Sequence, residues 1–171
     1  MSKTAAAVLA SFCLTLFSIP MSAQLIPSGN VYAGVSYGRF TNPVPPRQSY
    51  RGWNGSAEAI PFARFSHFGL VLDASGYYRT NLTNYNFLFG PRLATTYGKW
   101  RPFVQAMGGI RRVNSSGNIY NPVAIDIGGG ADYKLPFRNF SWRLQGDYMH
   151  TRYLSATQND FRASTGIVWR F

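Results

Sequence analysis

Few side chains in this sequence could act as nucleophiles or general bases. It has two histidines, His67 and His150, and a single cysteine, Cys13. Nucleophilic hydrolysis needs a serine next to a histidine that an acid holds in place. His150, Ser155 and Asp160 fall in or beside one predicted loop, at a spacing that supports no hydrolytic motif. We therefore predict no catalytic residue.

Neither the three glycines at 128–130 nor the lone cysteine predicts a bound cofactor or metal ion. A phosphate-binding glycine loop is followed by a helix, whereas residues 132–140 carry no helical pattern. We interpret the glycines as room for bulky neighbours and as an aid to strand curvature. A single cysteine gives neither a disulfide nor a cysteine-ligated metal, and we predict no cofactor and no metal site.

The chemistry that the sequence does indicate is ion pairing between buried acids and arginines. The chain has only six acids, and five of them stand mid-segment, on the side opposite the apolar residues. A buried charge must be paired and hydrogen-bonded because its desolvation is costly. We therefore predict a polar network inside a closed sheet. Its predicted members are Glu58, Asp73, Arg92, Gln105, Asp126, Asp132, Arg143, Asp147 and Arg162.

The elements that hold these side chains are predicted to be strands, because apolar residues recur at every second place. Leu72 and Ala74, for example, alternate with Asp73 and Ser75. Segments of about ten residues with this pattern are typical of transmembrane barrels. We distinguish eight such segments, at residues 30–40, 53–61, 69–78, 86–95, 102–113, 122–133, 141–150 and 161–171.

The first residues are set apart as an export signal. Lys3 precedes an apolar run over 5–19, and small residues end at Ala23, which is the pattern of a secretory signal peptide. The run is too short for a membrane helix. We predict a signal peptide over 1–23 and one barrel domain over 24–171.

Composition favours a wall that faces lipid. Charged residues make up 13% of the chain and aromatic residues 16%, with a net charge of +11, whereas soluble domains have about 25% charged residues. A sheet that crosses a bilayer must close, because lipid offers no partner to an open edge. The predicted fold is all-β, an eight-stranded antiparallel up-and-down transmembrane barrel whose interior is filled by side chains.

The connections are predicted to differ at the two ends of this barrel. Those after odd-numbered segments are rich in Pro, Gly, Asn and Ser and predict longer outer loops, and the others predict compact inner turns. Aromatic residues near both ends predict interfacial girdles. The outer girdle would comprise Tyr37, Phe40, Trp53, Tyr77, Tyr78, Phe87, Tyr120, Tyr148 and Tyr153. The inner girdle would comprise Phe62, Phe65, Tyr97, Trp100, Tyr133, Phe137, Trp142, Trp169 and Phe171.

Arginines also gather near the outer end. Guanidinium groups suit phosphate oxygens, so these residues predict contacts with lipopolysaccharide, although solvated charges that aid solubility are an equal alternative. The predicted lipopolysaccharide-contacting residues are Arg47, Arg51, Arg79, Arg112 and Arg152, and Arg39 and Arg111 are placed at the same rim.

Three segments carry a family resemblance: AIDIGGGADY at 124–133, RLQGDYMHTRY at 143–153 and GIVWRF at 166–171. With them the sequence resembles the small outer-membrane β-barrel proteins of Gram-negative bacteria, above all the membrane domain of the outer-membrane protein A family. The resemblance implies an assembly signal at Ile167, Trp169 and Phe171, read by the barrel assembly machinery after periplasmic chaperones. The periplasmic peptidoglycan-binding domain of that family is not expected here, since the sequence ends at Phe171.

We expect a structural or surface-interaction role in the outer membrane, and a narrow pore stays open as a variant of it. The expected partners are outer-membrane lipids and lipopolysaccharide, with no nucleic acid, and the chain is expected to be a monomer. One alternative is a soluble, exported, lipocalin-like ligand-binding barrel, which would turn its apolar face inward. Another is a lipid A-modifying enzyme, which would need a His-x-Ser pair where the sequence has His150-Thr151-Arg152.

Overall fold

A computed structural model describes residues 28–40, 48–61, 66–79, 82–115, 118–153 and 156–171. The predicted signal peptide, residues 1–23, lies outside them. Among the described residues, no helix has the length and apolar character needed to cross a bilayer. The strands are β1 (Gly29–Phe40), β2 (Gln48–Ala59), β3 (Phe68–Arg79), β4 (Leu82–Ala94), β5 (Trp100–Ser115), β6 (Asn118–Tyr120), β7 (Val123–Lys134), β8 (Phe140–Tyr153) and β9 (Ala156–Arg170).

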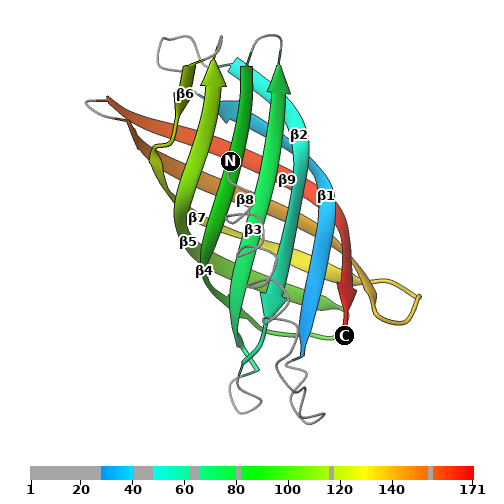
Figure 1. Cartoon of the computed structure of the whole chain (residues 1–171). Helices are drawn as coiled ribbons and strands as arrows, with labels where there is room; N and C mark the ends of the chain where they lie inside the picture. The colour runs from blue at the N-terminus through cyan, green and yellow to red at the C-terminus, as the bar shows by residue number, and fades with distance from the viewer. Residues whose placement is uncertain (1–27, 41–47, 62–65, 80–81, 116–117, 154–155) are drawn as a thin grey trace, which may run out of the picture.

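The eight long strands form a closed antiparallel barrel (Figure 1). Each pairs with its neighbour along the chain, except for the short β6, which pairs only with the outer end of β5. The first and last strands close the barrel, with a register that runs from Asn30↔Arg170 to Arg39↔Phe161. No long strand keeps an open edge, so the backbone groups of the wall are paired as a bilayer requires.

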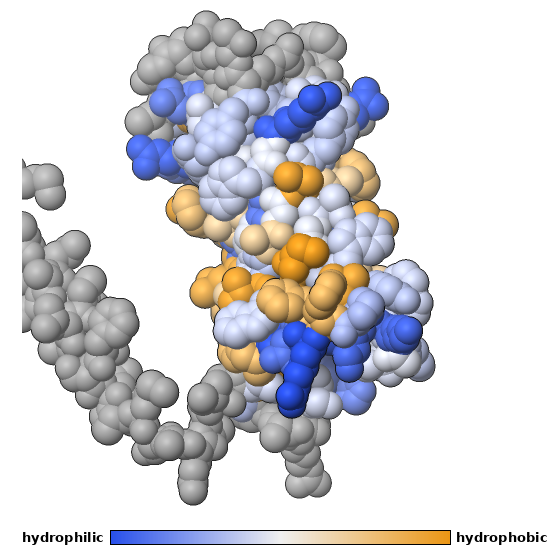
Figure 2. Space-filling model, turned by 90° about the vertical axis from the view of Figure 1, so that its right-hand side faces the viewer, coloured by the Kyte–Doolittle hydropathy of each residue, from blue (hydrophilic) through white to orange (hydrophobic). Residues whose placement is uncertain are grey.

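The two faces of the wall differ in the way that the sequence predicts. In β3, Leu72 on the outward face is 61% exposed and Asp73 on the inward face is 3% exposed. Ile127 and Leu144 are likewise exposed, at 63% and 55%. Apolar side chains form a belt across the middle of the face in Figure 2, and hydrophilic ones gather toward both ends. The predicted fold class and strand faces are confirmed.

The predicted strand boundaries are wrong at the outer end, which is the end opposite Gly29 and Phe171. β8 and β9 continue through residues that were predicted as a loop, up to the pair Tyr153↔Ala156. β3 ends at Arg79 and β4 begins at Leu82, so this connection is not a long loop either. The sequence there contains Asn, Thr and Gln, so apolar residues no longer recur at every second place. The backbone pairing of β8 and β9 nevertheless continues beyond the apolar belt.

The inner end carries Gly29, Phe171 and the turns at 95–99 and 135–139. Gly98 and Asn139 adopt left-handed backbone conformations, with φ of 59° and 72°, which short turns demand and which glycine and asparagine tolerate best. The backbone N–H of Lys134 donates to the carbonyl of Lys99 over 2.8 Å, so the two turns are held beside each other.

Candidate functional site

The interior of the barrel holds every acid of the chain. All six acids are at most 3% exposed. Six arginines point to the same interior, five of them buried and Arg170 partly exposed near the inner end. Six negative and six positive formal charges therefore cancel inside the wall. The chain has 17 Lys and Arg, so eleven cations remain besides these six, and no acid remains.

Arg162 is the centre of the outer half of this network. From β9 it crosses the interior and pairs with Asp147 of β8 through Nε at 2.8 Å. Its Nη1 lies 2.8 Å from Asp73 on β3. Its Nη2 lies 3.7 Å from Asp126 on β7, whose two carboxylate oxygens have no hydrogen-bond partner among the described residues. One guanidinium thus links four strands.

Glu58 and Asp132 organise the inner half. Glu58 accepts hydrogen bonds from Arg92 at 3.0 Å and from Arg101 at 2.7 Å. Asp132 receives a forked pair of hydrogen bonds from Arg143, at 2.6 and 3.1 Å. Such forked pairs fix geometry as well as charge.

Gln105 joins the two halves into one network. Its carbonyl oxygen accepts from Nε of Arg92 at 3.0 Å. Its amide nitrogen donates to Asp147 at 3.0 Å, and Asp147 pairs with Arg162. All nine predicted members of the polar network are therefore buried in the interior, and hydrogen bonds or ion pairs connect them.

Four further charged residues in the interior were not predicted as members. Arg101 pairs with Glu58, Arg170 pairs with Asp132 at 2.9 Å, and Asp160 pairs with Arg111 at 2.5 Å. Arg111 was placed at the outer rim with the phosphate-contacting residues, and this was wrong because its side chain is buried. The signal was present for Asp160, since it precedes Arg162 and Ser164 on the same two-residue period.

Aromatic and apolar side chains fill the remaining space. Phe40, Tyr50 and Tyr77 form a buried cluster, with the Phe40 and Tyr77 rings 4.7 Å apart, and the Arg111 guanidinium lies 4.4 Å from the Phe40 ring centre. The assignment of Phe40 and Tyr77 to the outer girdle was therefore wrong. A second buried cluster comprises Val71, Leu88, Met107, Ala124 and Met149.

Two of the glycines at 128–130 have a steric role in this packing. A side chain at Gly128 would collide with the carboxylate of Asp147, and one at Gly130 would meet the Phe103 ring. The Phe103 ring in turn lies against Arg92, with the guanidinium 4.2 Å from the ring centre. The glycines thus leave room for the network, as the sequence suggested.

The structure does not assemble the candidate catalytic group. His150 faces outward, and its Nδ1 lies 2.8 Å from the amide oxygen of Asn159. Asp160 faces inward, paired with Arg111, while Ser155 lies outside the described residues. His67 is exposed beside the inner end of β3. Within the described ranges, no three His, Cys, Asp or Glu side chains are grouped to hold a metal ion.

Part of the predicted outer rim can be placed. Arg39, Arg51 and Arg112 are exposed at the outer ends of β1, β2 and β5. Arg47 lies outside the described residues, and so do the side chains of Arg79 and Arg152. The predicted assembly residues Ile167, Trp169 and Phe171 are all exposed, and the first two point outward from β9.

No family model and no curated protein sequence matches the chain. Solved structures do match. Neisserial surface protein A is 13% identical, with 84% of this chain and 97% of that chain covered, at a TM-score of 0.68. The N-terminal β-barrel domain of Pseudomonas aeruginosa OprF is 16% identical, with coverages of 84% and 99%, at a TM-score of 0.59.

The Yersinia pestis attachment invasion locus protein, Ail, is 14% identical, with coverages of 86% and 100%, at a TM-score of 0.55. Its complex with the heparin analogue sucrose octasulfate is 13% identical over the same shares, at a TM-score of 0.54. These likenesses show that the chain has the fold of the small eight-stranded outer-membrane barrels.

Proposed function

We propose that this chain is a bacterial outer-membrane barrel with a structural and surface-interaction role and no enzymatic reaction. The observation that carries the proposal is the contrast between the faces of the wall. Leu72, Ile127 and Leu144 are more than half exposed, while the neighbouring acids are buried and paired. Exposing so many apolar side chains to water would cost free energy, whereas contact with lipid acyl chains would not. A soluble lipocalin-like barrel would need the opposite arrangement.

The interior supports a sealed barrel rather than a pore. Arginine networks fill the inner and middle levels, and the Phe40, Tyr50 and Tyr77 cluster fills the outer level. We expect the protein in a planar lipid bilayer to give no large, long-lived current steps. Stable open channels of the size that wide porins give would contradict a filled lumen.

We further propose that the outer rim binds the phosphates of lipopolysaccharide. Arg39, Arg51 and Arg112 are exposed there, and no acid of the chain lies outside the lumen to neutralise them. Ail, which shares the fold, has been crystallised with a sulfated sugar. Sulfated glycans are therefore a second candidate ligand class for the same rim, since sulfate and phosphate groups both suit guanidinium.

Binding to lipopolysaccharide tests this rim. We expect the triple variant Arg39→Gln, Arg51→Gln, Arg112→Gln to bind purified lipopolysaccharide at least about tenfold more weakly, since each cation near an anionic surface contributes about 1 kcal/mol. The matched control removes three inner-end cations, by Lys99→Gln, Lys134→Gln and Arg138→Gln, and should lose much less affinity for lipopolysaccharide than the outer triple. If both triple variants lost the same affinity for lipopolysaccharide, net charge alone would explain the binding. That result would contradict a binding site at the outer rim. A parallel titration with heparin tests the sulfated ligands.

The assembly signal at Ile167, Trp169 and Phe171 and the monomeric state remain part of the proposal. The wall position of these residues supports it, because a factor that reads the last strand must reach its lipid-facing side chains. Ile167, Trp169 and Phe171 are 46%, 47% and 49% exposed.

A further inference from the structure

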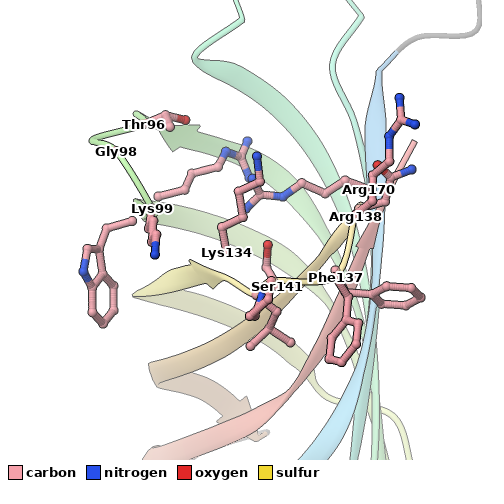
Figure 3. Close-up of a pocket in the computed structure, with 14 residues that line it drawn as sticks. Thr96, Gly98, Lys99, Lys134, Phe137, Arg138, Ser141 and Arg170 are labelled. Carbon is pink, nitrogen blue, oxygen red and sulfur yellow. The ribbon is translucent and has the colours of Figure 1, made fainter.

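The inner end of the barrel opens into a cleft of about 540 Å³ between the turns at 95–99 and 135–139. Figure 3 shows Lys99, Lys134, Arg138 and Arg170 around this opening. Sites for small molecules commonly have volumes of about 300–1,000 Å³, so the cleft could accommodate a compact ligand.

The charge of the cleft is one-sided. Its lining includes five cations, Lys99, Arg101, Lys134, Arg138 and Arg170, and no acid. Arg101 and Arg170 lie deepest and already pair with Glu58 and Asp132. Within the part of the chain that the structure describes, no carboxylate lies within ion-pair distance of Lys99, Lys134 or Arg138. The positive charge of these three residues is therefore available to a ligand.

Arg170 also lines the cleft, at its floor. Its Nη2 donates to Asp132 at 2.9 Å, and its side chain is 31% exposed. The interior network therefore holds this guanidinium in place while part of the side chain remains within reach of a ligand.

The walls of the cleft are fixed by the backbone. Lys134 N–H donates to Lys99 C=O at 2.8 Å, and Arg170 N–H donates to Asn139 C=O at 2.9 Å. Tyr97 and Trp100 exchange a pair of backbone hydrogen bonds at 2.8 and 3.0 Å. The backbone that carries these cations therefore needs little reordering when an anion binds, which reduces the entropic cost of binding.

Aromatic rings mark the level of the cleft relative to a membrane. Trp100, which lines it, is half exposed, and its ring lies 4.8 Å from that of Tyr133. Phe137 and Phe140, also in the lining, are 71% and 41% exposed. Such rings favour the interface between acyl chains and headgroups, which is where phosphate esters are concentrated.

We propose that this cleft binds a phosphate ester, supplied by the headgroup of an anionic phospholipid in the inner leaflet. Lys99, Lys134 and Arg138 neutralise the phosphate, and Arg170 donates from the floor. The inference rests on the proposed outer-membrane location, and a soluble phosphate ester of the periplasm would share the chemistry.

Two binding measurements on the purified protein in uncharged detergent test the cleft. Native mass spectrometry compares retention of phosphatidylglycerol with that of phosphatidylcholine, and calorimetric titration uses sn-glycerol 3-phosphate as the soluble ester. We expect phosphatidylglycerol to be retained at least tenfold better than phosphatidylcholine. The triple variant Lys99→Gln, Lys134→Gln, Arg138→Gln should lose that preference. The matched outer triple, Arg39→Gln, Arg51→Gln, Arg112→Gln, should lower that preference much less than the inner triple does.

The two arms also separate the sources of the ester. Lipid retention without measurable binding of glycerol phosphate supports the headgroup, and binding of glycerol phosphate that the inner triple abolishes supports the cleft with a soluble ligand. Two results overturn the proposal. One is an equal effect of both triple variants, and the other is no preference for phosphatidylglycerol together with no binding of glycerol phosphate. These assays take place in detergent, so a negative result would contradict the cleft proposal only. The membrane location of the barrel is tested separately, by fluorescence quenching in vesicles.

Discussion

Replacement of Arg162 by methionine is expected to lower the free energy of unfolding by about 3–5 kcal/mol, the usual cost of removing one partner from a buried ion pair. Arg162 is fully buried and lies 2.8 Å from both Asp73 and Asp147. Methionine keeps most of the volume but leaves these carboxylates without their main cation. Urea unfolding of the protein in phospholipid vesicles, followed by tryptophan fluorescence, measures the change.

Two controls separate this effect from the general cost of an interior substitution. Asp126→Asn removes a charge whose oxygens have no hydrogen bond to any residue that the structure describes. The nearest cation, Arg162, lies 3.7 Å away and keeps two closer acids, so we expect a change below about 1 kcal/mol. Arg51→Met removes an exposed arginine and should change stability by about 0.5 kcal/mol or less. If Arg162→Met cost no more than these two variants, the ion-pair network would not stabilise the barrel.

Leu72→Arg is the second substitution with a large expected effect, a loss of about 2–4 kcal/mol in vesicles. Leu72 lies mid-strand on the outward face, paired with Ala57 and Phe89 on its two sides. A charge there would enter the centre of the acyl-chain region. The same urea titration in vesicles measures it.

A substitution at the inner end provides the matched comparison. Tyr97 is 69% exposed in the turn before β5, at the level of the headgroups in our account, so Tyr97→Arg should cost about 0–1 kcal/mol. Equal, small effects at both positions would indicate that Leu72 faces water, as in a soluble barrel.

The sequence was sufficient for the faces of the strands because a period of two is a local property. Asp73, Asp126 and Asp147 each stand between apolar neighbours, and that order alone assigned them to the interior. Partners could not be assigned in this way. Arg162 meets Asp73 across the interior, from strands whose residues are 89 positions apart in the sequence, and only the closed register brings them together.

The misassigned residues lie near strand ends, where the apolar pattern fades. Phe40 and Tyr77 were assigned to a girdle because aromatic residues at strand ends suit both lipid and a buried plug. Gly38 lies against the Phe40 ring and Gly52 against the Tyr77 ring, with no side chain to block either. Sequence spacing does not reveal a cross-strand contact such as that between Gly52 and Tyr77. Arg101 and Arg170 were missed because both lie at the margin of a strand, where the face of a residue depends on the register.

Quenching of tryptophan fluorescence by brominated lipid tests most directly whether the apolar face touches acyl chains. The chain has four tryptophans, Trp53, Trp100, Trp142 and Trp169, each 40–50% exposed. In vesicles of phosphatidylcholine brominated on its acyl chains, we predict strong quenching compared with unbrominated vesicles, and little quenching by iodide in the water. Strong quenching by iodide with none by the brominated lipid would show that this face lies in water, and would contradict the account.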